Sequence, residues 1–222
     1  MSLPVTSTQR RGFLGSVAAG AAALVVGRWS TASAEIAPPF ESPGSGGEWV
    51  ARIKGKHRQV FDCTSPNAGF GAAFGLNFID STTQAEHLTD KDVTAVLSYR
   101  HMSMPLMLND AMWAKYKIGG VLGVTDPETN APATRNIFRD RVPLHPGVSY
   151  EQIMAGRSVI MTACNMALTA LSGMAAPKAG VSADTAKQDW TANLLPGVNL
   201  VPSGVYAVNR AQMAHCTYCD GG

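Results

Sequence analysis

The sequence predicts an α/β fold in which a mostly parallel sheet carries helices on both faces. Three observations indicate this fold. Short, largely apolar runs such as 93–97 suit strands that are covered on both sides. These runs alternate along the chain with segments whose apolar residues recur at helical spacing. The alternation of strand and helix requires right-handed crossovers, which limit the arrangement to the doubly wound class.

The elements of the first half follow from apolar spacing and from residues that end helices and strands. Ser65-Pro66-Asn67 ends the first strand, and Phe70, Phe74 and Phe78 then recur every four residues on one helical face. Gly119-Gly120 ends a second helix. The first-half strands are expected at 57–63 and 92–99, the helices at 68–79 and 105–116, and a long loop rich in Pro, Asp, Asn and Thr at 121–148.

The second half repeats the alternation. A buried strand is followed by a helix whose apolar residues are Met166, Leu168, Leu171 and Met174. The second-half strands are expected at 158–163, 198–201 and, as an edge strand, 217–219, and the helices at 150–155, 165–175, 183–195 and 204–214.

The N-terminus has the features of a twin-arginine export signal. Arg10 and Arg11 precede an Ala-rich apolar stretch, and Ala32-Ser33-Ala34 is a small-x-small cleavage site. A membrane anchor is the alternative, but the stretch is shorter than the roughly 20 apolar residues that cross a bilayer. We therefore expect residues 1–34 to be a signal peptide, 35–48 a Pro/Gly/Ser linker, and 49–222 a single domain that is soluble and periplasmic or otherwise extracytoplasmic.

The charge of the expected mature chain argues against nucleic-acid binding. Loss of residues 1–34 removes three of the 18 basic residues and none of the 16 acidic ones. No Lys/Arg cluster remains that could follow a phosphate backbone. The sequence contains no P-loop, no dinucleotide fingerprint and no G-x-S-x-G elbow, so no motif in it indicates a particular cofactor.

Reactive side chains follow three of the predicted strands. Cys63 ends the first, Arg100 and His101 follow the second, and Cys164 follows the third. Ligands of open parallel sheets bind beyond the carboxyl ends of the strands. The sequence therefore predicts a cysteine-centred site at this edge of the sheet.

Cys164 is the predicted nucleophile of this site. It lies between a strand and a helix, where unpaired backbone N–H groups favour a thiolate. Arg100 and His101 would favour the thiolate further if they lie close. The alternative is a buried thiol that behaves as a small apolar side chain.

Cys63 is a candidate partner for Cys164. If the first and third strands are neighbours, as in a 2-1-3 order, their ends lie roughly 5 Å apart. That separation fits a disulfide, whose Cα atoms are usually about 4.4–6.8 Å apart. The alternative is two unrelated core thiols.

The C-terminal C-x-x-C motif is a candidate metal site. His215, Cys216 and Cys219 provide three soft ligands within five residues, which suits copper or zinc. The alternatives are a frayed tail and a disulfide, because an even number of exported cysteines allows two bridges.

Two stretches resemble the DsrE/DsrF-like family. Arg100-His101 followed by Asn109-Asp110-x-x-Trp113-x-x-Tyr116 is the first, and Leu195-Pro196-Gly197-Val198-x-Leu200-Val201-Pro202-Ser203-Gly204-Val205 with Gln212 downstream is the second. The resemblance runs from about Lys56 to the C-terminus. It implies a flavodoxin-like sheet, a homotrimer or homohexamer, and a persulfide carried on one cysteine, which matches Cys164 here. The chain departs from the family's relays, which are cytoplasmic, in its export signal and in Cys216 and Cys219.

Three functions fit these observations. In the first, Cys164 carries sulfur or exchanges thiols with a partner protein, with Arg100 and His101 tuning it and Cys63 resolving it. In the second, His101, Cys164 and the C-terminal motif bind a metal or small cofactor. In the third, the chain is a non-catalytic interaction subunit whose cysteines form disulfides.

Overall fold

The computed structural model describes residues 47–222. The expected signal peptide, 1–34, lies outside these residues, as does the expected linker except Gly47 and Glu48. Within the described part, none of the helices has the length and apolar character that crossing a bilayer requires.

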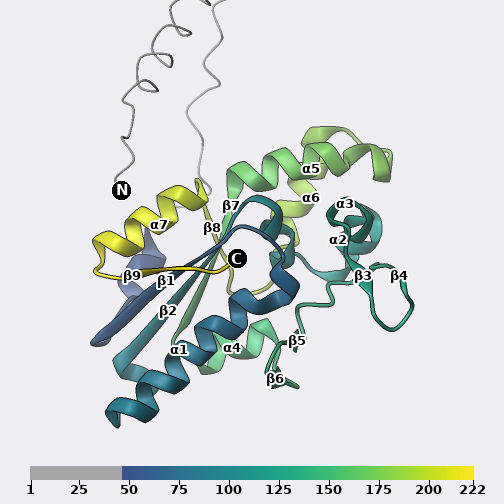
Figure 1. The fold of residues 1–222 in the computed structure, drawn as a ribbon. Helices are drawn as coiled ribbons and strands as arrows, with labels where there is room; N and C mark the ends of the chain where they lie inside the picture. Colours follow the sequence, from purple (N-terminus) through teal and green to yellow (C-terminus); the bar gives the residue numbers. More distant parts are fainter. Residues whose placement is uncertain (1–46) are drawn as a thin grey trace, which may run out of the picture. The chain divides into compact units, whose positions relative to one another are not determined.

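A five-stranded, fully parallel sheet forms the centre of the domain (Figure 1). The strand order is β8-β7-β2-β1-β9. Its members are β1 (His57–Cys63), β2 (Val93–Tyr99), β7 (Val159–Cys164), β8 (Asn199–Val201) and β9 (Thr217–Asp220). The sheet confirms the predicted α/β class with parallel strands, and all five strands lie within a residue or two of the predicted ranges.

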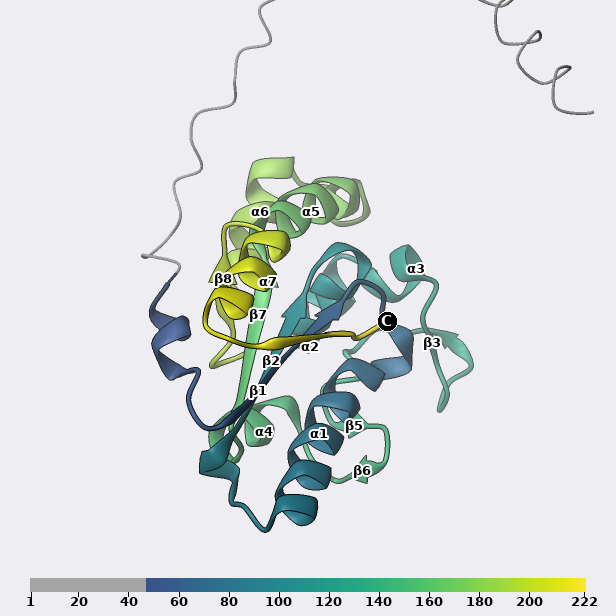
Figure 2. The same ribbon diagram turned by 60° about the vertical axis from the view of Figure 1, so that its left-hand side comes forward.

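Helices cover both faces of the sheet, as predicted (Figure 2). Successive strand residues point to opposite faces. Accordingly, Phe61 belongs to the larger apolar core and Val60 to a smaller one. The larger core contains side chains of α1 (Phe70–Glu86), α4 (Tyr150–Gly156), α5 (Asn165–Ala179) and α6 (Ala183–Ala192), and the smaller one those of η1 (Glu48–Arg52) and α7 (Gly204–Met213).

The predicted helix over 105–116 is wrong in its first half. Residues His101–Met107 form the 3-10 helix η4, which contains Pro105, and the α-helix α2 begins only at Asp110. Proline has no N–H to donate within an α-helix. Asn109 then restarts the chain as a helix cap, because its side chain accepts a hydrogen bond from the Met112 amide at 3.2 Å.

The segment expected as a long loop is mostly irregular after Leu122 and contains two short antiparallel strand pairs. Asn136 anchors it to η4, donating to the carbonyls of Leu106 and Leu108 at 2.7 and 2.8 Å. The remaining elements are η2 (Asn67–Gly69), η3 (Asp90–Asp92), α2 (Asp110–Lys115), α3 (Ile118–Leu122), β3 (Thr125–Asp126), β4 (Ala131–Pro132), β5 (Arg141–Val142) and β6 (His145–Pro146).

Candidate functional site

A cavity of about 380 Å³ opens at the carboxyl edge of the sheet, where parallel-sheet proteins bind ligands. Its walls come from the segments that follow β2, β7 and β8, including the amino-terminal ends of α5 and α7. The lining residues are Arg100, His101, Met102, Cys164, Met166, Ala167, Ala170, Leu171, Ser203, Gly204 and Val205. Three of the predicted site residues, Cys164, Arg100 and His101, thus line one cavity.

Cys164 ends β7 and caps the N-terminus of α5. Its Sγ accepts a hydrogen bond from the Ala167 amide at 3.3 Å. The side chain is 6% exposed, yet it lines the cavity rather than packing wholly within the core. Amides at a helix N-terminus carry partial positive charge, so this position suits a negatively charged sulfur.

Arg100 is fixed beside the cavity by a buried carboxylate. Its Nε and Nη2 donate to the two carboxylate oxygens of Asp62 at 2.6 and 2.8 Å. Tyr218 donates its hydroxyl to the same carboxylate at 3.2 Å. The hydrogen bond to Asp62 raises the pKa of Arg100 above its ordinary value, against a lowering by burial. Arg100 and Cys164 line the same cavity, so the guanidinium and the sulfur border one space.

Gly204 makes room for Arg100. A Cβ at this position would lie 2.4 Å from the Arg100 Cβ, which no side chain could tolerate without movement. Gly204 is the first residue of α7, and Ser203 caps that helix by accepting the Tyr206 amide at 3.2 Å. The Ser203-Gly204 turn thus closes the cavity on the side of α7.

His101 lies on the rim of the cavity with its side chain exposed. Its backbone has φ +50°, a left-handed conformation that is uncommon for residues other than glycine. Within residues 47–222 the imidazole makes no hydrogen bond or ion pair. Its place at the site follows from the backbone turn after β2.

The structure separates Cys63 from Cys164. The expectation that the first and third strands of the sequence are neighbours was wrong. Strand β2 lies between β1 and β7, with Cys63 paired to Tyr99 and Tyr99 to Ala163. Two strand spacings amount to about 10 Å, beyond the reach of a disulfide. Every residue of β2 is buried, which places this strand in the middle of the sheet.

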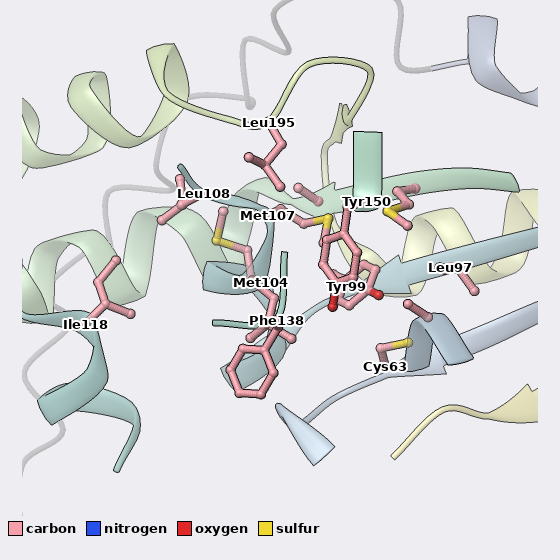
Figure 3. Packing of buried hydrophobic residues seen from close by; sticks show 14 of the residues in the cluster. Cys63, Leu97, Tyr99, Met104, Met107, Leu108, Ile118, Phe138, Tyr150 and Leu195 are labelled. Atoms are coloured by element: carbon pink, nitrogen blue, oxygen red, sulfur yellow. The ribbon is translucent and has the colours of Figure 1, made fainter. Parts of the chain in front are cut away.

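Cys63 also points to the other face of the sheet. Its side chain is 1% exposed and belongs to the larger core, where Figure 3 labels it with Leu97 and Tyr99. Burial raises the pKa of Cys63 well above its ordinary value near 9.0, and the charge of Asp62 raises it further. In this position Cys63 cannot resolve a disulfide at Cys164 without a large rearrangement.

The C-terminal ligands do not converge. Cys216 is buried in the smaller core, whereas Cys219, three residues on, packs against the larger core on the opposite face. Burial raises the pKa of Cys216 to about 11, although the nearby charge of Arg58 lowers it. Burial also raises the pKa of Cys219, and the charge of Asp220 raises it further. Across residues 47–222, no three His, Cys, Asp or Glu side chains come together as a metal site would require.

Two residues that hold the site together were missing from the sequence prediction. Asp62 is a carboxylate inside a buried strand, which signals a paired cation, because Asp is almost never fully buried alone. Tyr218 lies between Cys216 and Cys219 and reaches Asp62 only because β9 pairs with β1. No local signal in the sequence points to that pairing.

Comparison with known proteins assigns no family to this site. No family model matches the chain, and neither the curated proteins nor the solved structures contain a significant match. None of the four cysteines, all of which lie within residues 47–222, forms a disulfide in the structure. The chemistry of the cavity therefore has to be inferred from its residues: a thiol at a helix N-terminus, a compensated guanidinium, a rim imidazole and apolar walls.

Proposed function

We propose that Cys164 is the nucleophile of a thiol-exchange or sulfur-carrier protein. The observation that carries this proposal is the position of its Sγ, which accepts the Ala167 amide at 3.3 Å while lining a cavity beside Arg100. A sulfur that attacks another sulfur needs access and stabilisation of its anionic form. Both are provided here by the same short segment.

The step begins with the Cys164 thiolate attacking one sulfur of a disulfide or a persulfide. A new S–S bond forms at Cys164, the old S–S bond breaks, and the departing group leaves as a thiolate. Attack on the outer sulfur of a persulfide leaves Cys164 carrying that sulfur. Arg100 and the amides at the start of α5 stabilise the sulfur anion before attack and after release.

The setting of this chemistry forms part of the proposal. Arg10-Arg11 and the cleavage site at Ala34 support export by the twin-arginine route to an extracytoplasmic compartment. The DsrE-like resemblance supports a homotrimer or homohexamer and a protein partner that donates or accepts sulfur. Cys63 has no part in the proposed step, and neither does the His215-Cys216-Cys219 motif.

Competition between Cys164 and Cys219 tests the proposal. Cys219 is the most exposed of the four cysteines, so accessibility alone would make it react first. The proposal expects Cys164 to be alkylated faster at neutral pH, as followed by peptide mass spectrometry after timed iodoacetamide. Cys164→Ser should remove the fast phase, and the matched control Cys219→Ser should retain it. Material purified after natural export should show a reducible mass increase of about 32 Da on Cys164 if it carries sulfur.

Two results would contradict the proposal. If Cys164→Ser leaves the fast phase intact, another sulfur is the nucleophile. If Cys164 reacts no faster than a thiol in the unfolded chain, the cavity does not activate it.

A further inference from the structure

The cavity contains few groups that could bind a charged ligand. Among its lining residues only Arg100, His101 and Cys164 are ionisable. Arg100 already gives Nε and Nη2 to Asp62, itself only 5% exposed, so a ligand would meet a guanidinium whose charge is largely offset by a carboxylate. The Tyr218 hydroxyl donates a further hydrogen bond to the Asp62 carboxylate, which helps to hold that carboxylate against the guanidinium.

The helix N-termini at the cavity do not alter this balance. The amide of Ala167 donates to Sγ of Cys164, and that of Tyr206 donates to the Ser203 hydroxyl. The partial positive charge of α5 is therefore directed at the sulfur itself. Both of these amides therefore already have an acceptor within the protein.

The rest of the wall is apolar. Met166 and Val205 are 59% and 65% exposed on the rim, and Met102 is 38% exposed. Ala170 and Leu171 complete this surface. A carboxylate or sulfonate entering here would lose water without gaining a free cation, which is unfavourable. It would also approach the thiolate as a like charge.

We infer that the Cys164 cavity selects uncharged disulfides and persulfides over anionic ones, and that Asp62 sets this selectivity by offsetting most of the charge of Arg100. The inference rests on the proposed function. During exchange, a single negative charge spreads over the attacking, central and leaving sulfurs. A neutral substrate keeps the total at one negative charge, whereas a dianionic one triples it.

Two disulfides of similar size test the selectivity. Bis(2-hydroxyethyl) disulfide is uncharged, and dithiodiacetate is a dianion. Their rates of mixed-disulfide formation at Cys164 are measured by peptide mass spectrometry at about pH 8, where imidazoles are mostly neutral. The ratio of the neutral to the anionic rate is divided by the same ratio for N-acetylcysteine amide. We expect the normalised ratio to be at least about 10.

The charge of the Arg100–Asp62 pair is then varied. Asp62→Asn frees one positive charge beside the sulfur and should lower the normalised ratio by at least about tenfold. The double variant Asp62→Asn/Arg100→Gln removes both charges and should return the ratio to within about threefold of the parent. Circular dichroism checks that each variant is folded. If Asp62→Asn is not folded, the normalised ratio of the parent protein alone tests the selectivity.

The outcomes separate the inference from the function on which it rests. Fast reaction with both disulfides at a normalised ratio near 1 overturns the inference and leaves the nucleophile in place. An unchanged ratio in Asp62→Asn overturns the role of Asp62. If Cys164 reacts with neither disulfide faster than the reference thiol, the proposed function fails and the inference fails with it.

Discussion

Cys63 and Cys164 end two strands of one sheet at the same edge, yet their surroundings have little in common. Cys63 faces the larger core and Cys164 faces a cavity beside α7. Their exposed fractions, 1% and 6%, barely differ. The face to which each strand directs its last residue, and the element that follows, therefore decide which thiol can react.

Three glycines near the two strand ends show the same difference. A Cβ on Gly71 or Gly221 would lie 2.6 or 2.7 Å from Sγ of Cys63, so α1 and the C-terminal residues close around that sulfur. At the other strand end, Gly204 approaches Arg100, and the space beside Cys164 remains open. Small residues seal one thiol in the core, and a small residue positions a cation beside the other.

The largest expected difference is in reaction rate. Modification of Cys63 requires opening of the core, whose cost approaches the roughly 5–15 kcal/mol of global unfolding. We expect Cys63 to be alkylated at least about a thousandfold more slowly than Cys164 in the native protein. Timed alkylation with peptide mass spectrometry measures both rates, and in denaturant the two should become similar. Comparable alkylation rates of Cys63 and Cys164 in the native protein would show that the two strand ends do not differ in the accessibility of their thiols.

Gly71→Ala should perturb the sealed thiol. The added methyl group overpacks the contact with Cys63, and we expect a loss of about 1–3 kcal/mol in the free energy of unfolding, reduced somewhat by the better helix propensity of alanine. Gly71→Ala/Cys63→Ala should recover most of this loss. Chemical denaturation measures each variant, and Gly120→Ala is the control, since nothing lies within 4 Å of its added Cβ.

Gly204→Ala is the counterpart at the open strand end. It should cost a similar free energy of unfolding because its Cβ meets Arg100. Unlike Gly71→Ala, it should also slow the alkylation of Cys164, since Arg100 must move. Equal alkylation rates of Cys164 in Gly71→Ala and Gly204→Ala would show that the position of Arg100 does not affect the reactivity of Cys164.

The strands were predictable because each is a local pattern of residues. Val93 to Leu97 indicates a buried strand wherever it lies in the sheet, and the observed β2 matches it. The order of the strands depends on contacts between distant segments, so placing Cys63 next to Cys164 was wrong. The C-x-x-C spacing indicated shared ligands, but β9 directs Cys219 to one core while Cys216 enters the other.

The site was predictable only in part for the same reason. Cys164 and Arg100 were identified because each follows its own strand. Their arrangement depends on Asp62 from β1 and Tyr218 from β9, which parallel pairing of the two strands brings together. A prediction confined to strand ends finds the reacting groups and misses those that hold them in place.

The smallest expected effect concerns His101, which the sequence suggested as a tuning group. Its imidazole is exposed and makes no hydrogen bond or ion pair within residues 47–222, so no contact links it to the sulfur. Its backbone has a left-handed φ of +50°. We expect His101→Ala to change the alkylation rate of Cys164 by less than about twofold at pH 7 and above. His101→Gly should in addition raise the free energy of unfolding by up to about 1 kcal/mol, because glycine adopts positive φ freely. A tenfold slower rate in both variants, with unchanged stability, would instead make His101 a base for the thiol and place the activation of Cys164 on the rim of the cavity.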